Sequence, residues 1–147
     1  MGEHDAVSQY FKDATTRVTL WNPATRVAQM FFRMTEALEP YAERPCGVVD
    51  LGYDEYDVDP EVFAAFVDTL AGRYLASNHP ILKSMIAGYL PAAVVMVERS
   101  GRTLKSMIAA IERSHEAISL HDDAFDPAGD TVELRRSAEA AARAMPT

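Results

Sequence analysis

The feature that most constrains the fold is an apolar stretch without a charged side chain that runs from Ser84 to Val97. Its 14 residues include Gly88 and Pro91, whereas a membrane-spanning helix needs about 20 apolar residues. The stretch Ile81–Val97 is apolar on nearly every face, which is typical of a helix enclosed by other elements. Because proline lacks an amide hydrogen and clashes with the preceding turn, we expect a bend between Gly88 and Pro91. The chain is therefore predicted to fold around a bent, buried central helix.

Two short runs of β-branched and aromatic residues, 8–11 and 16–21, flank a polar turn and predict an N-terminal β-hairpin. Asn22-Pro23 and Asp59-Pro60 are typical helix starts, with a capping side chain before a proline. Apolar spacing predicts helices after both, and further helices over 103–118 and 130–145. The first of these helices carries an apolar stripe that we expect to face the core, formed by Val27, Met30, Phe31, Met34, Leu38 and Tyr41.

These elements predict a helix-dominated α+β fold, in which an N-terminal β-hairpin packs on a bundle of four to five helices. We expect one domain over residues 1–147, with flexible ends at 1–7 and 146–147. Residues 45–59 read as an acidic loop, although Val48-Val49 and Tyr56–Val58 are strand-like and one of them could join the hairpin. Methionines on the apolar stripes, such as Met30, Met85 and Met96, are expected to fill gaps in the core.

Charge is unevenly distributed along the chain. The 22 acidic and 14 basic residues give a net charge of −8, which argues against binding to a nucleic-acid backbone. Between Arg44 and Arg73 there is no basic residue, but there are seven acids: Asp50, Asp54, Glu55, Asp57, Asp59, Glu61 and Asp68. We interpret Asp54, Glu55 and Asp57 as a surface that binds a basic protein partner.

The cysteine content and the first residues of the chain suggest a cellular location. A single cysteine, Cys46, excludes an internal disulfide and a multi-thiolate zinc site, which suits a reducing cytoplasm. The first residues are polar and lack the apolar stretch of a secretory signal. We therefore expect a cytoplasmic protein with no cofactor, no metal and no membrane partner.

Three segments resemble a family of small uncharacterised actinobacterial proteins, a domain of unknown function: Ser8-Gln-Tyr-Phe11, Thr19-Leu-Trp-Asn-Pro23, and Val58-Asp-Pro60 leading into Phe63–Asp68. The family's acidic Asp-Glu element before the Asp-Pro is similar to Asp54-Glu55. The likeness covers about the first hundred residues and implies no activity. The family's cysteine lies at a different position, so the resemblance gives Cys46 no role.

The candidate catalytic residues are Glu112, His115 and Glu98. A Glu and a His three residues apart on one helix can face the same ligand, as in di-iron bundles, but a second Glu-x-x-His is missing from the sequence. We therefore expect His115 to be a hydrogen-bonded histidine of the helix, with a ligand-facing role as the alternative. Glu98, on the preceding helix, is the first partner to examine.

A bend at Gly88–Pro91 could also open a pocket lined by Trp21, Tyr89 and His115. Two functional hypotheses follow. The first is a non-enzymatic protein-binding or regulatory module, of the immunity or antitoxin kind, that uses the acidic segment. The alternative is a small-molecule binding protein or a cofactor-independent enzyme with its pocket at the bend. Self-association as a homodimer through an apolar helix face is compatible with either.

Overall fold

The computed structural model describes residues 7–116 and 126–147, and for residues 111–116 it describes the backbone alone. Four strands come first, interrupted by one helix: β1 (Tyr10–Asp13), β2 (Thr19–Trp21), α1 (Thr25–Ala42), β3 (Val48–Asp50) and β4 (Glu55–Val58). Five helices follow: α2 (Pro60–Ala76), α3 (Pro80–Ala87), α4 (Leu90–Arg99), α5 (Lys105–Glu116) and α6 (Pro127–Ala144). The predicted helix-dominated α+β fold is confirmed.

The sheet has the strand order β2-β1-β4-β3. β1 and β2 form the predicted antiparallel hairpin, and β4 pairs with β1 in parallel, with Phe11 opposite Tyr56. Both strand-like pieces of the acidic segment are strands, and they form a second hairpin of β3 and β4. The interpretation of 45–59 as a loop was therefore too simple, because the alternating Tyr56 and Val58 bury their side chains against the core.

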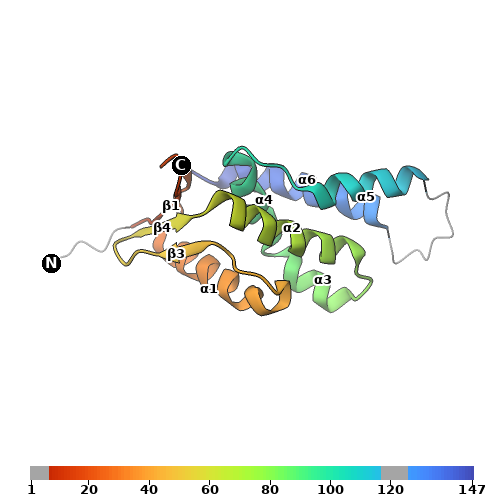
Figure 1. The fold of residues 1–147 in the computed structure, drawn as a ribbon, viewed down its shortest axis with the longest axis horizontal. Coiled ribbons are helices and arrows are strands. Elements are labelled where there is room, and N and C mark those ends of the chain that lie inside the picture. The colour runs from red at the N-terminus through yellow and green to blue at the C-terminus, as the bar shows by residue number, and fades with distance from the viewer. Residues whose placement is uncertain (1–6, 117–125) are drawn as a thin grey trace.

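Figure 1 shows the sheet at one end of the molecule, with α1 running beneath it and α5 and α6 along the opposite side. α2 and α4 lie between these layers, and α4 packs closely on α6 and α2. The core contains the aromatic side chains of both hairpins and of α1, and Phe11 stacks on Tyr56 with a ring-centroid distance of 4.5 Å. α4, whose apolar side chains are mostly buried, therefore connects the sheet to the helical layer.

The predicted central helix is broken where Gly88 and Pro91 occur in the sequence. α3 ends at Ala87, α4 begins at Leu90, and the two helices differ in direction by 47°. Their environments also differ, because α4 is buried on most sides whereas α3 exposes Ile81 and Met85. The expectation that all of 81–97 is enclosed is thus correct only for α4. Among the described helices, none alone is long and apolar enough to cross a membrane.

The predicted helix starts are partly correct. Asp59 caps α2 by accepting hydrogen bonds from the backbone N–H groups of Glu61 and Val62, with Pro60 in the first turn. Asn22 is not a cap, because α1 begins three residues later and has no side-chain cap. At the end of the chain, the carbonyl oxygen of Pro146 accepts a hydrogen bond from the Asn22 N–H at 2.7 Å. This hydrogen bond holds Pro146 in place, although we expected residues 146–147 to be flexible. Of the other expected flexible end, residues 1–6 lie outside the described part of the chain.

The buried side of α1 differs from the predicted apolar stripe. The side that faces the core carries Ala28, Phe31, Phe32, Thr35 and Ala42. Met30, a member of the predicted stripe, has an exposed fraction of 66%. Met85 of α3 is exposed to 69%, so the expectation that these methionines fill the core is wrong, whereas it holds for the buried Met96.

The orientation of α1 can be tested with two truncations. We expect Phe32→Ala to lower the free energy of unfolding by about 3–5 kcal/mol, because a buried aromatic ring is lost and a cavity remains. Met30→Ala should change it by less than about 0.5 kcal/mol, since its side chain lies in solvent. Urea unfolding followed by circular dichroism measures both, and the opposite order would contradict this orientation.

Candidate functional site

Two of the predicted partner-binding acids lie on the solvent-facing side of β4 and have basic partners. Lys12 Nζ is 2.9 Å from a carboxylate oxygen of Glu55. Arg17 bridges both acids, with its guanidinium 2.6 Å from Asp57 and 3.2 Å from Glu55. The hydrogen bond to Asp57 raises the pKa of Arg17 above its ordinary value. The negative charge of Glu55 and Asp57 is therefore largely balanced within the chain.

Asp54 lies in the turn before β4, and its carboxylate has a neutral hydrogen-bond partner in place of a basic one. Its carboxylate accepts a hydrogen bond from Gln9 Nε2 at 3.3 Å, and Gln9 Oε1 accepts one from the Tyr56 hydroxyl at 2.8 Å. Burial and the nearby charges of Asp50 and Asp54 raise the pKa of Tyr56. These residues line a polar cleft of about 400 Å³ beside α1. The three acids do not form one patch.

The predicted pocket residues Trp21 and Tyr89 are core residues. Both rings contact Phe31, with centroid distances of 5.2 Å and 4.8 Å. Thr35 donates its hydroxyl hydrogen to the Phe31 carbonyl, so the Tyr89 hydroxyl donates to Thr35 Oγ1 at 2.7 Å. Burial raises the pKa of Tyr89 well above its ordinary value. The bend at 88–91 is thus packed against α1 by a ring that is 1% exposed.

Glu98, the candidate partner of His115, is exposed at the end of α4. Its carboxylate is 2.6 Å from a guanidinium nitrogen of Arg135 in α6. The backbone positions of Glu112 and His115 fall in α5, but their side chains lie outside the described part of the chain. Glu98 and Arg135 border a small apolar cleft of about 260 Å³ between α5 and α6. The predicted Glu98–His115 centre remains a prediction.

Cys46 is buried at the start of the second hairpin. Its thiol lies within 3.8 Å of the Val48 carbonyl oxygen, and its backbone N–H donates to Glu39. Burial raises the pKa of the thiol, and the charge of Glu39 raises it further. A nucleophilic cysteine needs the opposite shift, because the thiolate is the reactive species. Among the described side chains, no three His, Cys, Asp or Glu residues are placed to hold a metal ion.

Sequence reasoning assigned the apolar stripe of α1 to the core, whereas the structure leaves part of it at the surface. Helical geometry puts the residues at 27, 30, 34, 37 and 38 on one side of the helix, next to the buried side. No charged residue falls on this side. Val27, Met30 and Ala37 are exposed, and Met34 and Leu38 are half-buried. We call these five residues the apolar helix face.

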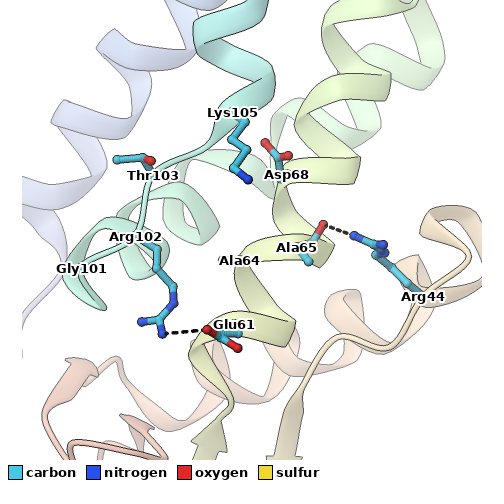
Figure 2. Close-up of a pocket in the computed structure, with 9 residues that line it drawn as sticks. All are labelled: Arg44, Glu61, Ala64, Ala65, Asp68, Gly101, Arg102, Thr103 and Lys105. Carbon is cyan, nitrogen blue, oxygen red and sulfur yellow. Dashed lines mark hydrogen bonds and ion pairs between the residues drawn. The ribbon is translucent and has the colours of Figure 1, made fainter.

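Sequence reasoning missed a groove of about 580 Å³ that crosses the exposed side of α2. Figure 2 shows Arg44 on one side of α2, and Arg102 and Lys105 on the other, with Ala64 and Ala65 between them. Three separate segments bring these cations together, so no local sequence pattern marks the site. We call it the α2 groove.

Comparisons with known proteins assign a family. A family model described as a family of unknown function (DUF6086) matches residues 7–147. The match extends well beyond the first hundred residues, where the resemblance lay. No curated protein and no solved structure matches the chain.

The buried Tyr89 hydroxyl gives a pH-dependent prediction. Since its pKa is raised in the folded state, the unfolded chain loses this proton first, and stability falls as the pH rises through about 10. Tyr89→Phe should lower the free energy of unfolding by about 1 kcal/mol at neutral pH. It should also reduce the further decrease of this free energy at about pH 10.5. Urea unfolding at both pH values measures this. Tyr53→Phe is the exposed control, and an equal effect of both variants would contradict the role of Tyr89.

Cys46 should react slowly in the folded protein. We expect alkylation by iodoacetamide at about pH 8 to be at least about a hundredfold slower than for a free thiol, and to become fast in urea, because only opening exposes the thiolate. Mass spectrometry of timed samples measures the rate. Rapid labelling of the folded chain would contradict the burial.

Proposed function

The chain belongs to a family of unknown function, DUF6086, across residues 7–147, and we propose that it is a non-enzymatic protein-binding module that recognises its partner through the apolar helix face. The observation that carries this proposal is the uncharged, partly exposed side of α1 in a chain of net charge −8. Exposed apolar patches of this kind are typical of protein interaction surfaces. We expect the biological role to be regulatory, of the immunity or antitoxin kind.

Methionine suits such a surface. Met30 and Met34 have flexible, polarisable side chains that adapt to a partner, and methionine is frequent at adaptable binding sites. The spacing of Val27, Met30, Met34 and Leu38 matches the repeat with which two helices pack side by side. We therefore propose that the partner contributes an amphipathic helix.

α3 also carries exposed apolar side chains. It exposes Ile81 and Met85, which lie one turn apart on the helix. The residue that follows its end, Tyr89, contacts α1 through Phe31 and Thr35.

The charges beside the face favour a different protein over a second copy. Arg26 and Arg33 border it on α1. Arg33 is 3.0 Å from a carboxylate oxygen of Glu36, whereas Arg26 has no ion pair among the described residues. A second copy docked antiparallel through the same face would place its own Arg26 and Arg33 at the same rim, where like charges repel. We propose a partner helix with apolar residues on one side and acidic residues along its flank.

The other functional hypotheses take second place for structural reasons. Glu55 and Asp57 have basic partners within the chain, so less negative charge is left for a basic partner than the sequence suggests. A small-molecule site at the bend is less favoured because Tyr89 and Leu90 are buried. The cytoplasmic location stays part of the proposal, since Cys46 is a free thiol.

A photo-crosslinking experiment in the source organism tests the proposal. With p-benzoylphenylalanine in place of Met30, we expect a covalent adduct with one other protein, and none with the same label in place of the exposed Glu139 of α6. With that protein purified, Met30→Asp should weaken binding at least about tenfold, because a charge would be buried in the contact. Ala140→Asp, which adds the same charge on α6, should leave binding unchanged.

Three results would contradict the proposal. The first is no adduct at position 30, and the second is an equal adduct at the control position. The third is an adduct of the chain with itself, which would replace the acidic partner helix by a homodimer.

A further inference from the structure

The α2 groove gathers cations in an otherwise acidic chain. Arg44 donates a hydrogen bond to the Ala65 carbonyl oxygen at 3.0 Å, which fixes its position without neutralising its charge. The side-chain ammonium group of Lys105, at the start of α5, has no hydrogen bond or ion pair among the described residues. Arg102 lies 3.8 Å from Glu61 and donates to the Ser100 carbonyl oxygen at 3.1 Å. The groove therefore presents three positive groups, and one of them has a carboxylate neighbour.

The two acids of the groove compensate these cations weakly. Asp68 accepts hydrogen bonds from the Ser106 N–H at 2.9 Å and from its hydroxyl at 2.7 Å. These bonds place its charge at the N-terminus of α5, where the helix dipole stabilises it. The Glu61 side chain is 83% exposed, so its pair with Arg102 contributes little and can open. An incoming carboxylate can then take the place of Glu61.

The shape of the groove favours an elongated ligand. Ala64, Ala65 and Gly101 line it, and such small residues allow close approach of a backbone. A neighbouring cleft of about 310 Å³ beside Pro45 and Val62 shares Arg44, Glu61 and Ala65 with the groove. The two hollows therefore run together across α2, with positive charge on both sides, as Figure 2 shows for the groove. A single phosphate ion would fill only a small part of this space.

We infer that the α2 groove binds an acidic peptide segment of a partner protein, with its carboxylates paired to Arg44, Arg102 and Lys105 and its backbone over Ala64 and Ala65. Carboxylates pair well with guanidinium groups, which offer several parallel donors. The groove contains no residue of the apolar helix face. The two surfaces are therefore independent, and either can fail without the other.

The probe for this inference is N-acetylated, amidated hexaglutamate, with hexaglutamine as the uncharged control. We expect hexaglutamate to shift the backbone NMR signals of 61–68 and 101–105, and this binding to weaken as salt is added. The double variant Arg44→Gln/Lys105→Gln should bind at least about tenfold more weakly. The control Arg136→Gln/Arg143→Gln removes the same charge from exposed positions on α6 and should bind like the wild type. Circular dichroism of each variant checks that the fold is kept.

Four results would overturn the inference: no binding at low salt, shifts confined to other segments, equal weakening in the two double variants, or equal binding of hexaglutamine. A fifth is displacement by inorganic phosphate at the concentration of the peptide, which would identify a phosphate site instead. Met30→Asp should leave hexaglutamate binding unchanged. Failure of the crosslinking experiment at Met30 thus contradicts the proposed function without affecting the groove. Failure of hexaglutamate binding contradicts the groove as a peptide site without affecting the proposed function.

Discussion

The burial of α4 on nearly all sides is the constraint on which the rest of the fold depends. Its apolar side chains, from Leu90 to Val97, need neighbours in every direction, which α2, α6 and the sheet supply. Arg99 at its end joins these neighbours, because its guanidinium donates to the carbonyl oxygens of Leu20, Ala142 and Met145. The Arg99 side chain thereby provides hydrogen-bond donors for carbonyl oxygens at the end of α6 and connects this end to β2. The helical layer and the sheet are held together at the point where the central helix leaves the core.

Local signals made most of the elements predictable from the sequence. Asp59-Pro60 marks the start of α2 because capping and the fixed backbone angle of proline act within one turn. Gly88 and Pro91 mark the break between α3 and α4 for a similar reason. The orientation of α1 could not be predicted in this way, since its apolar residues occupy two adjacent sides and only tertiary contacts select one. Phe32 is buried because Tyr56 of another segment lies against it.

The candidate sites were less predictable, because charge partners are distant in sequence. Asp57 meets Arg17 across 40 positions of the chain, so a run of acids without a nearby base gives a misleading picture of the surface charge. The cations of the α2 groove come from the segment after α1, the turn after α4 and the start of α5. Asp68, which counts as one more acid in the sequence, acts as the cap of α5. The composition correctly indicated an acidic protein. It could not indicate which charged side chains lack a partner of opposite charge within the chain.

The two apolar sides of α1 connect the fold to the proposed function. A helix with apolar residues on two adjacent sides can bury only one of them against a single layer. In this chain the side with Phe31 and Thr35 packs on the sheet and the α3–α4 break, and the side with Met30 and Met34 is left partly in solvent. Leaving apolar side chains in water forgoes the free energy of their burial. Met34 and Leu38 still pack against the core, so burial within this chain explains their presence, but it does not explain Met30, which is 66% exposed. The partner helix that we propose would bury this side chain.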